Sequence, residues 1–272
     1  MLNSFSVRLA AALFVATLSA SGAHATLYSW NYTAGMAQPP APGGYEVNSN
    51  GGAIQTIVST FDSNTKRLTF DVQFGPPTGS GSLQTEGFWL VLNGGPNPKA
   101  QPGEYAIFYF DGRSFSSPKL TVYGYNGENN GSSWYDGNGS AAGTVAPDLI
   151  KGSSSSEASS FINSISAGDS GGRRRFSFDI DATSIINRTP LYPAPDGSPW
   201  FGTGYSNSLG IWMHSFQDFD ASYYSTGKKG LKSGTAFDKG GYLDGSFFPT
   251  VPAPGSTTLL ALGGAALLRR RR

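Results

Sequence analysis

Alternation of apolar and polar side chains is the feature that most constrains the fold of this chain. The segment RLTFDVQF, residues 67–74, carries an apolar side chain at every second position. Because successive side chains of a strand point to opposite faces, this period predicts a half-buried strand with Leu68, Phe70, Val72 and Phe74 on its inner face. The segment AIQTIVSTFD, residues 53–62, precedes it, and the turn-forming residues Ser63–Lys66 lie between the two. Together they predict a β-hairpin.

Further short apolar segments follow, separated by stretches rich in Gly, Ser and Asn. They are GFWLVLNGG (87–95), EYAIFYFDG (104–112), KLTVYGYNG (119–127), RRRFSFDID (173–181, with Phe176, Phe178 and Ile180 inward), LGIWMHSF (209–216) and GYLDGSFF (241–248). The continuous apolar run in the first of these predicts a strand buried on both faces. Many short strands with 37 glycines in 272 residues predict an all-β fold, an antiparallel, jelly-roll-like β-sandwich.

Helical segments are few in this pattern. Residues 181–187 could form one short helix, with Asp181 as its cap. Residues 153–166, SSSSEASSFINSIS, fit either a helix or an edge strand. No internal repeat of fixed period is present, which disfavours propellers and solenoids.

Composition excludes several classes of site. The chain has no cysteine and two histidines, His24 and His214, so disulfides, thiolate nucleophiles and His-rich metal sites are excluded. The 19 basic residues include Arg8 and four terminal arginines, and without these five the body has 14 basic residues against 18 acidic ones. The body is therefore mildly acidic, which does not fit a nucleic-acid-binding protein. The interior run Arg173–Arg175 is interpreted as a solvated strand end.

The N-terminal segment has the layout of a secretory signal. Arg8 precedes an apolar run from Leu9 to Leu18, and small residues lead to Ala23-His24-Ala25. A short apolar run before an A-x-A pattern predicts a signal peptide of residues 1–25, cleaved after Ala25.

The C-terminal segment, residues 251–272, has three parts. Val251, Pro252, Ala253, Pro254 and Gly255 form an extended, helix-disfavouring element. Thr257–Leu268 is apolar and, at about 1.5 Å per residue, is about 18 Å long as a helix, against a hydrocarbon core of about 30 Å. Arg269, Arg270, Arg271 and Arg272 follow and hold the end of the chain in the cytoplasm. This layout predicts a short transmembrane helix that stalls export and is then trimmed.

This tail resembles the PEP-CTERM sorting signal of bacterial envelope proteins, in which a Pro-x-Pro element precedes a short transmembrane stretch and an arginine cluster. Pro252 and Pro254 match the two prolines, whereas Ala253 stands where the family usually has Glu. The resemblance implies that an exosortase-like enzyme processes the chain near the Pro-rich element. Several body segments between Phe88 and Phe216 also look like parts of uncharacterised bacterial surface proteins with such tails, which implies an extracellular β domain over residues 26–250.

Acidic residues and the second histidine are the candidates for chemistry. Asp179 and Asp181 are two apart on one strand, about 6.5–7 Å from each other, which suits a glycosidase pair and equally an ordinary polar strand face. His214 could act as a base with Asp218 or Asp220, or be a structural histidine. These sets, and the strand-end acids Glu86 and Glu104, give no catalytic assignment.

Metal and cofactor sites are not assigned either. The polar stretch Asn126–Ser140 offers oxygen ligands, including Glu128 and Asp136, but lacks the spacing of a calcium loop. No metal ion and no cofactor is therefore expected.

Aromatic side chains in polar stretches are the remaining functional signal. Trp134 and Tyr135 form one pair, and Trp200 with Phe201 and Tyr223 with Tyr224 form two more. Such rings either stack on sugars or fold back to seal the ends of the sandwich. Trp134, Tyr135 and Trp200 are the candidates for ligand contact.

The sequence therefore predicts a non-enzymatic protein of the cell envelope or extracellular matrix. The export machinery and an exosortase-like enzyme are its expected partners, with extracellular polysaccharide as a candidate ligand and the inner membrane as a transit anchor. A carbohydrate-active enzyme, glycoside hydrolase or lyase, on the same scaffold is the alternative, and a tail that is never cut is another. The expected location is the envelope or the extracellular space.

Overall fold

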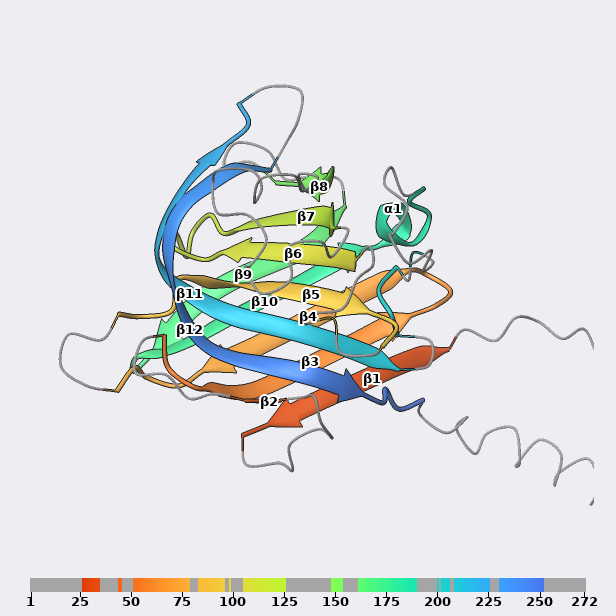
Figure 1. Ribbon diagram of the computed structural model, residues 1–272, viewed down its shortest axis with the longest axis horizontal. Coiled ribbons are helices and arrows are strands. Elements are labelled where there is room, and N and C mark those ends of the chain that lie inside the picture. Colours follow the sequence, from red (N-terminus) through yellow and green to blue (C-terminus); the bar gives the residue numbers. More distant parts are fainter. Residues whose placement is uncertain are drawn as a thin grey trace, which may run out of the picture.

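The fold is seen in a computed structural model of the chain, which describes residues 26–34, 44–45, 51–78, 83–95, 98, 105–125, 148–153, 161–189, 200, 202–205, 208–225 and 230–251. These residues form two antiparallel sheets and one short helix (Figure 1). The five-stranded sheet has the order β1 (Leu27–Thr33), β3 (Ile54–Asp62), β4 (Arg67–Phe74), β10 (Arg173–Asp181) and β9 (Ile162–Ser170). The seven-stranded sheet has the order β2 (Gly44–Tyr45), β12 (Leu231–Phe247), β11 (Leu209–Tyr223), β5 (Gly87–Asn93), β6 (Tyr105–Asp111), β7 (Lys119–Tyr125) and β8 (Asp148–Gly152).

The prediction of an all-β antiparallel fold is confirmed. Every strand pair is antiparallel, and the helix α1 (Thr183–Ile186) has four residues. Among the residues that the structure describes, no helix has the length and apolar character needed to cross a membrane. The expected signal helix (1–25) and the expected short transmembrane helix near the C-terminus both lie outside the described residues.

The hairpin of β3 and β4 forms where the sequence predicts it. Asp62 Oδ1 accepts hydrogen bonds from the backbone N–H groups of Asn64 at 2.8 Å and Thr65 at 3.1 Å. Lys66 closes the turn with a positive φ of 58°. The same backbone N–H groups hold the pKa of the Asp62 carboxyl below its usual value.

A core rich in phenylalanine lies between the two sheets. Phe70 of β4 contacts Phe178 of β10 with ring centroids 5.6 Å apart, and Phe178 stacks on Phe108 of β6 at the same distance. Phe88 of β5 lies 5.7 Å from Phe70 and 5.3 Å from Phe110. These contacts join the sheets, and the inward positions predicted for β4 and β10 are confirmed because their side chains are almost fully buried.

Several elements differ from the sequence prediction. β11 and β12 are 15 and 17 residues long, well beyond the predicted segments, and β1, β2 and β8 were not expected. The last residues of the segment 153–166, which fits either a helix or an edge strand, lie in the edge strand β9. The helix predicted over residues 181–187 is the single turn α1. At the start of β10, Arg174 pairs with Asp169 at 2.8 Å and Arg175 with Asp71 at 2.9 Å.

The two ends of the described domain meet at β1. The backbone N–H of Thr26 donates to Ser63 Oγ at 3.0 Å. Ser29 and Thr250 exchange both backbone hydrogen bonds, at 2.8 and 2.7 Å. The hydrogen-bonded domain therefore extends from the residue after the predicted signal cleavage to the residue before the predicted sorting element.

Shortening a ring of the central core should destabilise the whole fold. Phe178→Ala removes a ring that is 2% exposed and is expected to lower the free energy of unfolding by about 3–5 kcal/mol. Phe248→Ala is the control, because that ring is 74% exposed and its loss should change the free energy by less than about 0.5 kcal/mol. Urea unfolding followed by circular dichroism measures both, and equal effects would contradict this assignment of the core.

Candidate functional site

The seven-stranded sheet buries apolar side chains on both of its faces. One face contributes to the core described above, and the other carries a second, largely aromatic cluster. The second cluster contains Trp89, Val91, Tyr105, Ile107, Tyr109, Tyr123, Trp212, Phe216, Phe219 and Leu231. The sheet curves strongly, and the long strands β11 and β12 turn at one side of the molecule and run past the ends of β5, β6 and β7 toward β8 (Figure 1). The second cluster therefore lies on the inner side of this curved sheet.

An aromatic row crosses four neighbouring strands on this face. Tyr109 of β6 is opposite Trp89 of β5, Trp89 is opposite His214 of β11, and His214 is opposite Tyr242 of β12. The ring centroids are 4.9 Å apart for Trp89 and His214 and 5.5 Å apart for His214 and Tyr242. These four residues are called the aromatic row below. Trp212 meets the row edge-on, 4.8 Å from Trp89.

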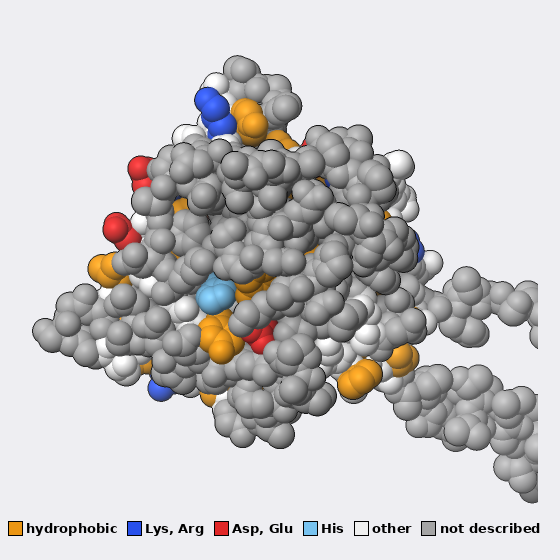
Figure 2. Space-filling model, in the orientation of Figure 1, with side chains coloured by type: hydrophobic (Ala, Val, Ile, Leu, Met, Phe, Trp, Pro, Cys, Tyr) orange, Lys and Arg blue, Asp and Glu red, His pale blue; other side chains and the backbone are white. Residues whose placement is uncertain are grey.

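The two members of the row on β11 and β12 are more exposed than the two on β5 and β6. Tyr109 and Trp89 are buried, whereas His214 and Tyr242 are half-buried. The described histidine is visible from outside, with apolar and acidic side chains beside it (Figure 2). Neither Trp89 Nε1 nor Trp212 Nε1 has an acceptor among the residues that the structure describes. The face thus combines stacking surfaces with two unused hydrogen-bond donors.

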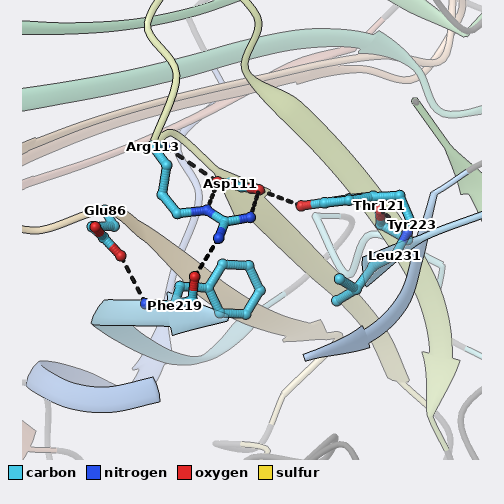
Figure 3. A network of polar contacts seen from close by, with 7 residues as sticks. All are labelled: Glu86, Asp111, Arg113, Thr121, Phe219, Tyr223 and Leu231. Atoms are coloured by element: carbon cyan, nitrogen blue, oxygen red, sulfur yellow. Dashed lines mark hydrogen bonds and ion pairs between the residues drawn. The ribbon is translucent and has the colours of Figure 1, made fainter. Parts of the chain in front are cut away.

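A polar network ties the bent end of β11 back to β6 (Figure 3). Arg113 donates from Nε to Asp111 Oδ1 at 3.0 Å and from Nη2 to Asp111 Oδ2 at 2.9 Å, and also donates to the Phe219 carbonyl. Its guanidinium lies 4.9 Å from the centroid of the Phe219 ring. Tyr223 donates its hydroxyl to Asp111, and Glu86 accepts the Phe219 N–H at 2.7 Å. This network is called the seam.

The seam continues to β7. The Leu231 N–H donates to Thr121 Oγ1 at 2.8 Å, and Tyr123 donates its hydroxyl to the Leu231 carbonyl. Gly230 has a φ of 122°, and a Cβ there would lie 2.9 Å from the Thr121 methyl group, so the approach requires glycine. The start of β12 is therefore fixed directly over β7, and the curled sheet is closed on this side.

The titration behaviour of the seam fits a structural role. Burial alone would raise the pKa of Asp111, but the hydrogen bonds from Arg113 and Tyr223 outweigh it and hold that pKa below its usual value. Burial and the neighbouring Asp111 carboxylate raise the pKa of Tyr223. Near neutral pH the acid stays ionised and the phenol protonated, so this pair does not shuttle a proton.

Asp179 and Asp181, the pair considered for glycosidase chemistry, form hydrogen bonds with neighbouring residues of the five-stranded sheet and of α1. Arg67 donates from Nε to Asp179 Oδ1 at 2.9 Å, and Asn163 donates to the same oxygen at 3.0 Å. Asp181 Oδ1 accepts the Thr183 N–H at 2.9 Å at the start of α1. The pKa of Asp179 is lowered by Arg67, and the pKa of Asp181 is lowered by Thr183. Neither carboxyl is held protonated, as a general acid would be.

The other predicted residues fall in different places. Trp200 donates from Nε1 to the Ile185 carbonyl at 2.7 Å, packs against the core between the sheets, and has the Arg188 guanidinium 4.8 Å from its ring centroid. Glu86 precedes β5 and belongs to the seam, whereas Asp218 and Asp220 are exposed on β11. Val251 is described and exposed.

Several predicted residues lie outside the described part of the chain. They are Ala23, Ala25, Glu104, Glu128, Trp134, Tyr135, Asp136, Pro252, Ala253, Pro254, Gly255, Arg269, Arg270, Arg271 and Arg272. Within the described ranges, no three His, Asp or Glu side chains gather as a metal site.

The aromatic row was missed by the sequence analysis. Its members lie in segments that were recognised as strands, and the alternation in LGIWMHSF does place His214 with Trp212 on one face. The missing information is the register between strands, which no local pattern supplies.

Comparison with the known protein families, with curated proteins and with solved structures finds no match to this chain.

The seam should give the protein an acid-sensitive component of stability. The folded-state pKa of Asp111 lies below that of the unfolded chain, so its contribution is complete above the unfolded value of about 3.9 and is lost as pH falls through the folded value. Asp111→Asn is expected to cost about 2 kcal/mol at pH 7. This difference from the wild type should shrink below about pH 4.

Urea unfolding between pH 7 and pH 3 measures the change. Asp218→Asn is the matched control because Asp218 is exposed, and it should follow the wild type at every pH. A constant cost for Asp111→Asn across this range would contradict the assignment.

Proposed function

We propose that this chain is an exported, non-enzymatic protein of the cell envelope or extracellular matrix, sorted through its C-terminal tail and associated with extracellular polysaccharide. Its processing partners are the export machinery and an exosortase-like enzyme. The tail anchors it in the inner membrane during transit.

The positions of the two domain ends support the sorting part of the proposal. The hydrogen bonds of the domain begin at Thr26 and reach Thr250, and Val251 is 54% exposed. Removal of residues 1–25 and of the tail after Pro254 would therefore break none of these bonds. Val251, directly after the last paired residue, is exposed and so accessible to a processing enzyme.

The aromatic row supports the polysaccharide part of the proposal and is the observation that carries it. Sugar rings have flat apolar faces that stack on aromatic side chains. Tyr242 and His214 present half-buried rings 5.5 Å apart at the accessible end of the row. The row lies on strands rather than on loops, so its spacing is fixed by the sheet.

The finer features of the fold belong to the same proposal. We take residues 1–25 to form a signal helix and Thr257–Leu268 a short transmembrane helix before processing. The two sheets share one core, as in a β-sandwich. A jelly-roll-like path remains the proposed topology, with hairpins inside each sheet.

Mass spectrometry of the mature protein tests the sorting proposal. The native chain is expected to begin at Thr26 and to end near Pro254. Replacement of Arg269–Arg272 by four glutamines should remove the stop and change the destination of the protein. A mature chain that retains Arg272 would show an uncut membrane anchor and would overturn the processing step.

Pull-down with polysaccharide from the producing cells tests the row. Tyr242→Ala is expected to weaken retention about tenfold, because one ring–ring stack is worth roughly 1.4 kcal/mol. Tyr242→Phe should retain the stacking, and Phe248→Ala removes an exposed ring elsewhere and should have no effect. Equal retention by Tyr242→Ala and the wild type would remove the row from the proposal.

A further inference from the structure

We infer that a hollow beside the seam residues Asp111 and Arg113 is a subsite for a sugar ring that carries one negative charge. The hollow has a volume of about 270 Å³ and is lined by Asp111, Arg113, Ser114, Ser117 and Lys119. This inference rests on the proposed polysaccharide association and adds the class of sugar. The volume lies just below the range of about 300–1,000 Å³ that is typical of ligand pockets, which fits a single ring rather than a chain.

The charges of the lining residues leave one positive charge in excess. Asp111 and Arg113 neutralise each other through two hydrogen bonds, and the Tyr223 hydroxyl donates a third hydrogen bond to Asp111. The side chain of Asp111 is only 7% exposed, so its contact with a ligand is limited, whereas Arg113 is 30% exposed. The remaining charge is that of Lys119.

Lys119 is placed to receive an anion. It begins β7 opposite Asp111, and its Nζ lies 4.0 Å from the centroid of the Tyr223 ring. Among the described residues, Lys119 forms no ion pair with an acid, so its ammonium group keeps donors for a ligand. The ring of Tyr223 also restricts the side chain, which lowers the entropy cost of binding.

The two serines supply the groups that a sugar ring needs. Ser114 and Ser117 lie on the turn between β6 and β7, and the Ser117 N–H donates to the Ser114 carbonyl at 3.1 Å. This bond fixes the backbone of the turn whose Ser114 and Ser117 line the hollow, and Ser114 Oγ also lies 3.3 Å from Ser116 Oγ. Each hydroxyl can donate to and accept from a sugar hydroxyl.

Excess charge and hydroxyl groups together select the ligand class. One ammonium group matches one monoanionic group, either a carboxylate or a sulfate ester, and the serines favour a hydroxylated ring over a simple ion. A neutral sugar would leave Lys119 without a counter-charge. The hollow therefore discriminates between acidic and neutral sugars.

Calorimetric titration of the mature protein tests the inference. The probes are methyl glucuronide, glucose 6-sulfate, methyl glucoside and inorganic sulfate. The two acidic sugars should bind saturably, and methyl glucoside and inorganic sulfate should bind at least tenfold more weakly. The stronger of the two acidic sugars identifies the anionic group. Higher sodium chloride should weaken the binding of both.

Charge-matched variants locate the site. Lys119→Gln should weaken binding of the acidic sugars about tenfold, and Lys119→Arg should keep it. Lys151→Gln, on β8, removes the same charge away from the hollow and should bind like the wild type. Ser117→Ala should weaken binding of the acidic sugars severalfold, while Lys119 still pairs with their anionic group. This variant tests the hollow even where Lys119→Gln unfolds the protein.

Three results would overturn the inference: equal binding of methyl glucuronide and methyl glucoside, binding of inorganic sulfate as strong as that of the sugars, or unchanged binding by both Lys119→Gln and Ser117→Ala. These failures are separate from failure of the proposed function. Polysaccharide retention that depends on Tyr242, without binding of either acidic sugar, would leave the proposed function standing and remove only this subsite.

Discussion

The hydrogen bonds from Arg113 to the Phe219 carbonyl and from Tyr223 to Asp111 join the bent end of β11 to the end of β6. Two long strands that bend away from a sheet expose an apolar face unless something fixes their far end. Arg113 donates a hydrogen bond to the carbonyl of Phe219 and lies over the Phe219 ring. Tyr223, on the same strand as Phe219, donates its hydroxyl to Asp111. Leu231 then lies against Thr121, which covers the apolar side chains between the strands. The seam thus joins β6, β7, β11 and β12 around the second buried cluster.

This curvature explains the unusual composition of the central strands. β5 and β6 are buried along their whole length, because one face meets the five-stranded sheet and the other lies inside the curl. A strand in that position needs apolar side chains on both faces, which gives a continuous apolar run instead of alternation. β4, by contrast, has one solvated face and keeps its period of two. In a chain without disulfides, the two clusters provide most of the stabilising burial.

The sequence predicted the strands better than it predicted the site. Phe70 and Phe178 could be placed inward because the alternation within one segment determines the face of the strand. The seam joins Asp111 to Tyr223, which are 112 residues apart, and the row depends on the relative register of β6, β5, β11 and β12. Neither follows from local pattern, since a shift of one residue would place His214 on the opposite face. The lengths of β11 and β12 were also underestimated, because their bent parts contain polar residues that resemble a loop.

The pairing of the acidic residues narrows the chemistry that the described domain offers. The described carboxyl groups with a resolved pKa shift are those of Asp62, Asp111, Asp179 and Asp181, and all four shifts are downward. Hydrogen bonds from arginine side chains, from the Thr183 and Tyr223 side chains and from backbone N–H groups cause these shifts, so these acids serve turns, strand pairs and the seam. A general acid at neutral pH requires the opposite shift, produced by burial without such donors. The two proposals therefore rest on the stacked rings of His214 and Tyr242 and on the ammonium group of Lys119, and not on a carboxyl group.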